Sequence, residues 1–299
     1  GTMHTLRENG WLVEAGPNGA LESTPGFEER LSVHGIKNEH RYADPASNKR
    51  YILRDGRLHQ LPMSASLFFK SRLWSVPGKL RLLKEPFVGR AEREETVAEF
   101  VERRLGREFL DYAINPFVAG VFAGNPEQLS VRTAFPKLYA LEEKYGGLVK
   151  GMIGGARERK KRAEVAKDRA QMFSFASGMQ VFPDALARYL GMAVQCGCQV
   201  TRLMIRKVGA DDLPPFSVEY TLGGKSSVLD ADAVVVAIPA YAAASLLESH
   251  VPALAAQMRE VYYPPVAEVF LGYRADQCAQ PLDGFGYLIP AKERRQILG

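Results

Sequence analysis

Short apolar runs separated by turn signals occupy both ends of the chain, whereas a helical period governs its middle. Residues 1–62 carry strand-like runs, GWLVEAGPNG and NKRYILRDGRLHQLP, and Asp55-Gly56 in the second suits the tight turn of a hairpin. The run DAVVVAIP at 232–239 places apolar residues between an acid and a proline. This pattern predicts a buried parallel strand that ends at a site.

Residues 63–170 predict helices. In ETVAEFVERRLGREFLDYAINPF, apolar residues recur at steps of three and four and form one face: Val97, Phe100, Val101, Leu105 and Phe109. Thr96 with Glu99 predicts a capping box at the start of this helix. The run KLYALEEKYGGLVKGMIGGARERKKR predicts another helix, which its glycine pairs should weaken or bend.

Residues 171–299 return to alternating helix and strand signals. FPDALARYLG and AYAAASLLESHVPALAAQM predict helices, the second interrupted at Pro252. The runs QVTRLMIRKV, FSVEYTL, AEVFLGY and LDGFGYLIP predict extended segments. The chain therefore reads as a mixed α/β body interrupted by a helical insertion of about a hundred residues, long enough for a core of its own.

The amino-acid composition indicates a globular protein but does not indicate which reaction it catalyses. The chain has 299 residues, is 46% hydrophobic and 24% charged, and carries a net charge of +5, which is typical of a globular protein with a sizeable core. Cys196, Cys198 and Cys278 are expected to be free thiols in a reducing compartment. The histidines show no metal-ligand spacing, and no stretch of about 18 apolar residues could span a bilayer.

Three stretches are candidates for ligand contact, and each has a purely structural alternative. The loop 16–19, GPNG, is either an ordinary turn or a backbone that approaches a cofactor closely. Gly120 in NPFVAGVFAGNP either permits close helix packing or lets a flat apolar ligand lie on the backbone. Arg50 either faces solvent or grips a carboxylate through two hydrogen bonds.

Three further stretches remain equally open. GFGYLIP at 284–290 is either a core strand or an aromatic wall beside a site. The mixed basic and apolar segment 64–87 suits either a core helix or insertion at a membrane interface. The basic run 157–169 is either a solvated helix or linker, or a surface that attracts anionic lipid. Nucleic acid is disfavoured as a partner because no aromatic platform accompanies this run.

The chemistry of an enzyme with this sequence is expected to come from a cofactor. No nucleophile elbow, metal-ligand cluster or privileged carboxylate pair is visible in the sequence. The prediction for the metal is therefore none, and no side chain is singled out as catalytic. Cofactors carry the difficult chemistry in enzymes of this kind.

Several phrases together resemble the protoporphyrinogen oxidase family, FAD-dependent enzymes of haem biosynthesis. They are GWLVEAGPN, NKRYILRDGRLHQLP, FVAGVFAGNPEQLS within a longer match, FASGMQVFPDALA, DAVVVAIPA and LDGFGYLIPAKERRQILG. They occur in the family's order and cover nearly the whole chain. The resemblance implies oxidation of protoporphyrinogen IX to protoporphyrin IX with FAD and oxygen, through the removal of six electrons.

The resemblance also implies a three-part organisation on a partial FAD/NAD(P)-binding flavoprotein fold. A partial FAD-binding domain would comprise 1–20 and 171–245, and a mixed-sheet substrate domain 21–62 and 246–299. A helical membrane-binding domain would comprise 63–170. The expected location is the cytoplasm, with peripheral attachment to the inner face of the cell membrane, and a homodimer is compatible with the family.

Individual residues are carried over by their positions in these phrases. The resemblance implies that the substrate contacts Arg50, Gly120, Phe285 and Leu288. It implies that the cofactor contacts Gly1, Thr2, Gly16, Pro17, Asn18, Val200, Ala237 and Pro239.

The family's phosphate-binding GxGxxG has no counterpart in these residues, and the resemblance places it before residue 1. The C-terminal FAD-contacting segment of the family is likewise expected beyond residue 299. We therefore expect the isolated chain to bind FAD weakly and to lack turnover. Two alternatives stay open: oxidation of coproporphyrinogen III by the same chemistry, and a non-catalytic fragment that docks to a membrane or a partner.

Overall fold

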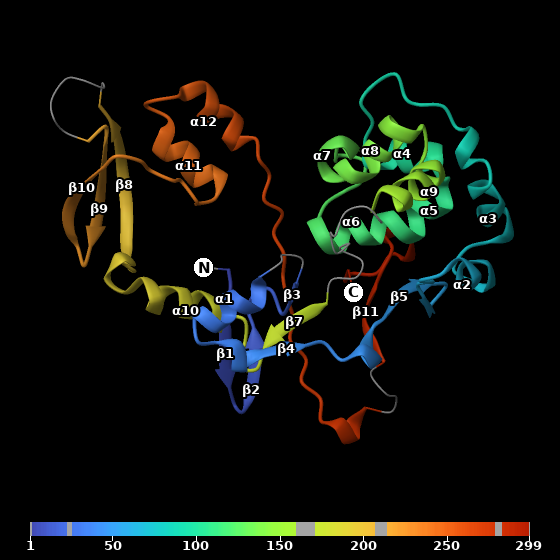
Figure 1. Cartoon of the computed structure of the whole chain (residues 1–299), viewed down its shortest axis with the longest axis horizontal. Helices are drawn as coiled ribbons and strands as arrows, with labels where there is room; N and C mark the ends of the chain where they lie inside the picture. The colour runs from blue at the N-terminus through green and yellow to red at the C-terminus, as the bar shows by residue number, and fades with distance from the viewer. Residues whose placement is uncertain (1, 23–25, 160–170, 207–213, 279–282, 299) are drawn as a thin grey trace. The chain divides into compact units, whose positions relative to one another are not determined.

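A computed structural model of the chain describes residues 2–22, 26–159, 171–206, 214–278 and 283–298 (Figure 1). The chain divides into two compact units. The first unit comprises residues 1–183 and 266–299, and the second unit comprises residues 184–265. Both contain helices and sheet, which confirms the predicted mixed α/β class.

The first unit contains three small sheets. Their strands are β1 (Thr5–Glu8), β2 (Trp11–Glu14), β3 (Ala20–Leu21), β4 (His40–Tyr42), β5 (Lys49–Arg54), β6 (Arg57–Gln60), β7 (Met172–Phe175) and β11 (Gly284–Leu288). β1 and β2 form a hairpin, β3-β7-β4 is antiparallel, and the third sheet has the order β11-β5-β6. In this third sheet β5 and β6 are antiparallel, whereas β11 joins β5 in parallel from more than two hundred residues further along the chain.

The predicted hairpin turn at Asp55-Gly56 is confirmed. Both residues adopt positive φ, 52° at Asp55 and 71° at Gly56. That conformation matches the right-handed twist of two antiparallel strands and favours Asp-Gly. The turn fixes the register of β5 against β6 and so sets which β5 side chains share a face.

Helices fill the middle of the first unit. They are α1 (Phe27–Val33), α2 (Ala65–Lys70), α3 (Val76–Leu82), α4 (Val97–Arg104), α5 (Arg107–Phe109), α6 (Asn115–Phe122), α7 (Val131–Ala134), α8 (Pro136–Tyr145) and α9 (Leu148–Arg159). Short helical turns are η1 (Lys37–Glu39), η2 (Pro45–Ser47), η3 (Glu85–Phe87), the π-helical η4 (Leu110–Ile114), η6 (Ala275–Gln277) and η7 (Ala291–Glu293).

The predicted helix over the ETVAEFVERRLGREFLDYAINPF run exists but is divided. The capping box is confirmed, because the Thr96 hydroxyl accepts from the Glu99 N–H and the Glu99 carboxylate accepts from the Thr96 N–H. The chain then breaks after α4, where Gly106 adopts φ 94°, and continues through α5 and η4 into α6. The apolar face is confirmed: Val97, Phe100 and Val101 are buried together with residues of η4 and α6.

The glycine pair at 146–147 divides the next predicted helix into α8 and α9. Gly146 adopts the left-handed conformation that commonly ends a helix, with φ 74°. The single weakened or bent helix that the sequence predicted is therefore two separate helices.

A buried ionic cluster joins these helices. The Arg104 guanidinium donates to Glu85 and to Glu142, each at 2.8 Å, and Arg104 and Glu85 are completely buried. Glu85 also accepts from the N–H groups of Leu148 and Val149, at 2.7 and 3.0 Å. One carboxylate thus neutralises a buried cation and caps the first turn of α9.

The second unit pairs a three-stranded antiparallel sheet with a helical hairpin. Its elements are β8 (Cys198–Ile205), β9 (Phe216–Leu222), β10 (Lys225–Ala231), α11 (Ala240–Leu247) and α12 (Pro252–Arg259), and it is entered through α10 (Val181–Leu190) and η5 (Gly191–Ala193). The sheet order is β10-β9-β8. His250 Nε2 lies 2.6 Å from the Leu203 carbonyl oxygen and links the helical hairpin to β8.

Two strand predictions are wrong. Residues 232–239 form no strand, and Val235 is 90% exposed. Residues 267–273 form no strand either. An apolar run becomes a strand only where a neighbouring backbone supplies hydrogen-bond partners, and no strand in the described part of the chain pairs with either run.

Candidate functional site

The parallel pair β5–β11 carries three of the four predicted substrate residues. Gly286 pairs with Arg50, and Leu288 pairs with Ile52. Paired residues of neighbouring strands share a face, and alternate residues of one strand do as well. Arg50, Ile52, Gly286 and Leu288 therefore lie on one face of this sheet. The register shifts between Gly284 and Gly286, which leaves Phe285 unpaired in a bulge.

Helix α6 approaches this same face at Gly120. A Cβ atom at Gly120 would lie 2.7 Å from Leu288 Cδ2, closer than real side chains come. Val118, two residues before Gly120 and so on the other side of the helix, is completely buried in the helical core. The opposite side of α6 leaves Phe117 and Val121 exposed. Gly120 and Leu288 thus meet directly, and an apolar helix face lies beside them.

Arg50 lies at the open end of the face. The strand rise of about 3.3 Å per residue places it roughly 7 Å along β5 from Ile52. Ile52 itself is buried against Leu73, Trp74 and Tyr112. Among the described residues, the Arg50 guanidinium forms no hydrogen bond or ion pair, and the side chain is exposed. An unpaired guanidinium beside an apolar surface suits a ligand that is flat and carries a carboxylate.

The neighbours of Arg50 are paired. Lys49 forms an ion pair with Asp283, and the Tyr51 hydroxyl donates to the other Asp283 oxygen at 3.0 Å. The hydrogen bond to Asp283 raises the pKa of Lys49, and the bond from Lys49 lowers the pKa of Asp283. Asp283 therefore pairs with the adjacent cation and anchors the start of β11, whereas Arg50 has no charged partner among the described residues.

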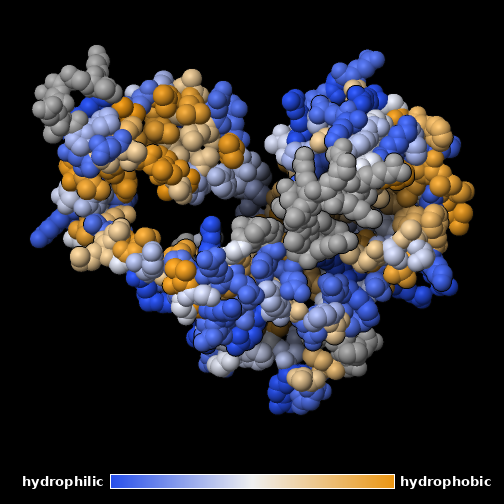
Figure 2. Space-filling view, in the orientation of Figure 1, coloured by the Kyte–Doolittle hydropathy of each residue, from blue (hydrophilic) through white to orange (hydrophobic). Residues whose placement is uncertain are grey.

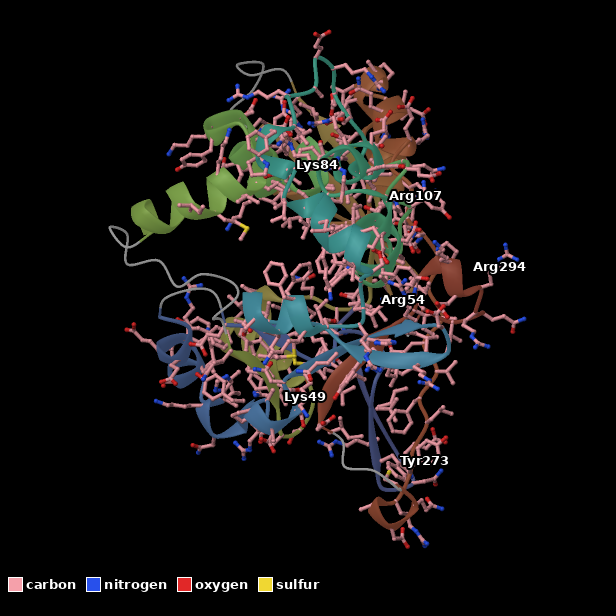
Figure 3. The ribbon with its side chains drawn as sticks, turned by 90° about the vertical axis from the view of Figure 1, so that its right-hand side faces the viewer. Lys49, Arg54, Lys84, Arg107, Tyr273 and Arg294 are labelled. Atoms are coloured by element: carbon pink, nitrogen blue, oxygen red, sulfur yellow. The ribbon has the colours of Figure 1, made fainter. Side chains whose placement is uncertain are left out.

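The inner end of β5 is fixed to the helices through Arg54. Its guanidinium donates to Glu108 at 2.8 Å and to the Leu73 carbonyl, and lies 4.3 Å above the Tyr112 ring. Burial opposes ionisation of Glu108, but hydrogen bonds from Ser75 and Arg54 outweigh it and lower the pKa of that carboxyl. Figure 3 shows Lys49 and Arg54 at opposite ends of β5, with Arg54 on the side toward Arg107, the first residue of α5.

The end of β11 is held just as firmly. The Asn115 side-chain oxygen accepts from the Ala291 N–H at 2.9 Å, and Lys292 forms a 3.0 Å ion pair with Asp111. A cavity of about 800 Å³ lies beside this junction, between α6 and residues 289–298. Its described lining includes none of the four predicted substrate residues. The predicted substrate residues thus lie outside this cavity, and three of them lie on β5 and β11.

Phe285 occupies the bulge and is 54% exposed. Unlike Leu288, it has no strand partner that dictates which face its ring covers. Phe117 and Val121, which are exposed on α6, and Gly286, which lies on the sheet face, were not singled out from the sequence. Their individual periodicity signals are those of ordinary helix and strand residues, so only the meeting of α6 with β11 distinguishes them.

Part of the predicted cofactor-binding set also comes together. A Cβ atom at Gly16 would lie 1.9 Å from the Thr2 carbonyl oxygen, so only glycine allows the two backbones to approach in this way. Pro17 and Asn18 are exposed beside them. Gly1 lies outside the described residues. The Glu14 carboxylate anchors this region by accepting from the Met179 N–H at 2.8 Å and from the Thr5 hydroxyl.

The remaining three cofactor predictions fall in the second unit. Val200 lies on β8 opposite Tyr220, next to the point where the register shifts. Ala237 and Pro239 are exposed, and Pro239 immediately precedes α11. The predicted contacts of these residues with a cofactor stay predictions.

Comparison with known families gives the class of protein. The model of the flavin containing amine oxidoreductase family matches residues 1–293. The chain belongs to this family, and its cofactor is accordingly a flavin.

Within this family the chain is similar to enzymes that act on porphyrinogens. It is 31% identical to the chloroplastic protoporphyrinogen oxidase of Oryza sativa subsp. japonica, over 97% of the chain and 56% of that protein. It is 29% identical to the protoporphyrinogen oxidase of Homo sapiens, over 97% of the chain and 62% of that protein. It is 27% identical to the coproporphyrinogen III oxidase of Bacillus subtilis, over 97% of the chain and 61% of that protein. The resemblance read from the motifs is confirmed, and the chain spans little more than half the length of these relatives.

Solved structures confirm the fold. A protein of Exiguobacterium sp. 255-15, provisionally named a protoporphyrinogen oxidase, matches 85% of this chain and 55% of its own, with a TM-score of 0.61 and 22% identity. The structure of reduced UDP-galactopyranose mutase matches 88% of this chain and 52% of the mutase chain, with a TM-score of 0.56 and 13% identity. At these identities the likeness concerns the fold alone.

Proposed function

We propose that this chain forms the substrate-binding and membrane-docking part of an FAD-dependent enzyme that oxidises protoporphyrinogen IX to protoporphyrin IX. The single observation that carries the proposal is the Arg50 guanidinium, which has no partner among the described residues and lies on the same sheet face as Gly286 and Leu288, where Leu288 meets Gly120. This arrangement offers one anion-binding group at the edge of an apolar surface. The similarity to porphyrinogen-oxidising relatives supports the same assignment.

The residues of the chain would bind and orient the substrate. Arg50 would hold a propionate through paired N–H···O bonds. Leu288 and the exposed side of α6 would cover the macrocycle and exclude water from it, and Phe285 would close the edge. A bound flavin would supply a two-electron acceptor, and oxygen, reduced to hydrogen peroxide, would be the final oxidant in each of three rounds. No side chain of the site is assigned the role of base.

The residues near Thr2 fit one side of a flavin. Their exposed, closely spaced backbone would face the ring system, with Gly16 allowing the approach. No GxGxxG occurs in the 299 residues, so these residues would hold the ring rather than the diphosphate. The assignment of FAD among the flavins, and of Val200, Ala237 and Pro239 as further contacts, forms part of the proposal.

Coproporphyrinogen III is the second candidate substrate. It is favoured by the similarity to the Bacillus subtilis coproporphyrinogen III oxidase over nearly the whole chain. Coproporphyrinogen carries more carboxylates than protoporphyrinogen, and Arg50 is compatible with either. Relative oxidation rates on the two porphyrinogens, measured with the same enzyme, distinguish these candidates.

The helical part, residues 63–170, is the proposed membrane-docking part. Apolar side chains on and beside α2 and α3 are exposed: Met63, Leu67, Phe69, Val76, Leu80, Leu83 and Phe87. Figure 2 shows apolar residues gathered over this region. Glu85, the one acid among residues 64–87, is buried in the ionic cluster, so the exposed charges of this segment are cationic. Within the described residues, no helix is long and apolar enough to cross a bilayer.

This surface suits peripheral attachment to an anionic leaflet. The proposed location is the cytoplasmic side of the cell membrane. The division into partial FAD-binding, substrate-binding and membrane-docking parts likewise belongs to the proposal.

The proposal is tested by titrating the chain with protoporphyrin IX, the product of the reaction, and following porphyrin absorbance and fluorescence. We expect binding by the unaltered chain and a loss of affinity of about tenfold or more in Arg50→Ala, because a charge-assisted hydrogen bond contributes about 1.5–3 kcal/mol. Arg50→Lys should retain part of the affinity. Arg57→Ala on the neighbouring strand is the matched control and should leave binding unchanged. No binding by the unaltered chain, or equal binding by Arg50→Ala, would refute the proposal.

A further inference from the structure

Gly286 occupies the position between the two ends of the proposed substrate site. It pairs with Arg50 across the parallel ladder, and Leu288 follows two residues later on the same face. A side chain at 286 would therefore stand between the Arg50 guanidinium and the contact of Leu288 with Gly120. The sheet has bare backbone at this point.

Nothing in the fold requires glycine at this position. The φ of Gly286 lies outside the left-handed region, and a Cβ atom there would meet no heavy atom within 4 Å. Two nearby glycines differ. A Cβ atom at Gly284 would lie 2.8 Å from the Tyr51 ring, and one at Gly120 would lie 2.7 Å from Leu288. Packing explains those two glycines but leaves Gly286 unexplained.

Glycine in a strand carries a cost. It loses more conformational freedom on folding than other residues and contributes no side chain to packing. A glycine in a strand often marks a bulge or a place where a ligand lies against the backbone. Gly286 borders the bulge at Phe285, but its φ lies outside the left-handed region and its Cβ position is open, so the bulge leaves room for a side chain there and the ligand role is favoured.

We propose that Gly286 determines which ligands the site admits, by letting one ring of a flat tetrapyrrole lie directly on β11 between Arg50 and Leu288. This inference rests on the proposed function. The missing side chain sets the depth of the site: any larger residue at 286 would lift the macrocycle off the strand. The carboxylate could then no longer reach Arg50 while the opposite side of the ring stays under α6.

The test is a series at this position, Gly286→Ala, Gly286→Val and Gly286→Leu, each titrated with protoporphyrin IX. Affinity should fall in steps, by less than about threefold for Ala and by more than about tenfold for Leu, which corresponds to about 1.4 kcal/mol. Gly89→Leu is the matched control, because Gly89 is also exposed, outside the left-handed region, and without a heavy atom within 4 Å of a Cβ. It should bind like the unaltered chain.

A second measurement separates blocked binding from lost structure. Urea unfolding should show the Ala and Val variants at least as stable as the unaltered chain, since their side chains enter open space and the conformational cost of glycine is removed. If Gly286→Leu does not fold, the loss of protoporphyrin IX affinity is measured on Gly286→Val instead. Equal affinity across the folded variants, in a chain whose binding depends on Arg50, overturns the role of Gly286 alone. Absence of binding by the unaltered chain overturns the proposed function and this inference together.

Discussion

At the scale of single residues, the site depends on which side chains are left without a partner. Lys49, Arg50 and Tyr51 are consecutive, yet Asp283 pairs only with the first and the third. Strand alternation is the cause: residues 49 and 51 point to the face where Asp283 lies, and residue 50 points to the other. One-residue changes in register would exchange these roles, which is why the hairpin turn at Asp55-Gly56 matters for the site.

The contact of Gly120 with Leu288 gives a prediction at this scale. Gly120→Ala should cost about 1–3 kcal/mol through overpacking, offset by up to about 1 kcal/mol of helix propensity. In a Leu288→Ala background the overpacking disappears, and the same change should stabilise the chain. Urea unfolding of the four variants in a double-mutant cycle measures this coupling. Additive effects would show that Gly120 and Leu288 do not touch.

At the scale of elements, the ionic cluster of Arg104, Glu85 and Glu142 determines how α4, α8 and α9 meet. Burial opposes ionisation of Glu142, but hydrogen bonds from Arg104 and Arg103 outweigh it and lower the pKa of that carboxyl. Glu142 therefore stays ionised inside the helical core, 2.8 Å from the Arg104 guanidinium. Removing one partner leaves the others buried and uncompensated, which costs far more than the pair itself contributes.

Arg104→Met should accordingly lower the free energy of unfolding by about 3–5 kcal/mol. Arg107→Met is a matched control, since Arg107 is also ion-paired, to Glu102 and Asp111, but is largely exposed. Exposed pairs contribute about 0–1 kcal/mol, so this control should change little. Urea denaturation of both variants provides the measurement. A similar loss in the two would show that burial of the cluster is not what stabilises these helices.

At the scale of the whole molecule, the first unit holds both the sheet proposed to bind the substrate and the helical surface proposed to dock to a membrane. The chain covers 56% and 62% of the plant and human relatives considered above, so the activity of the complete enzyme remains a proposal. Membrane docking, in contrast, rests on residues that the chain itself presents. It can be tested without turnover.

The chain should co-sediment with vesicles that contain anionic lipid, and raised salt should weaken the binding because it screens the basic residues. Replacing Leu83 and Phe87 together by serine should reduce binding several-fold, since Phe87 is 88% exposed and Leu83 lies close to it in the chain. Val33→Ser, an exposed apolar change on α1, serves as the control. Equal binding by both variants, or equal binding to neutral vesicles, would argue against docking through this surface.

Local signals in the sequence predicted local structure well. The Thr96–Glu99 capping box and the Asp55-Gly56 turn each depend on neighbouring residues only, and both are confirmed. The glycine pair at 146–147 was expected to weaken or bend a helix, and it ends one helix before the next begins. The failures at 232–239 and 267–273 have the opposite origin. Apolar composition shows that a segment can be a strand, but a partner strand from elsewhere must supply the hydrogen bonds. That partner cannot be read from the segment itself.

The sequence by itself determined the family and the kinds of side chain available: an arginine on a strand, glycines in an apolar helix, and a cationic apolar surface segment. Only the tertiary structure decided which of them meet. The parallel pairing of β11 with β5 brings residues 284–288 beside residues 49–54, and α6 then places Gly120 on Leu288. Contacts across such long stretches of chain follow from packing and register, which no local pattern encodes. For that reason the role of Arg50 could be suggested from the sequence, whereas the bare backbone at Gly286 emerged only once the strands were paired.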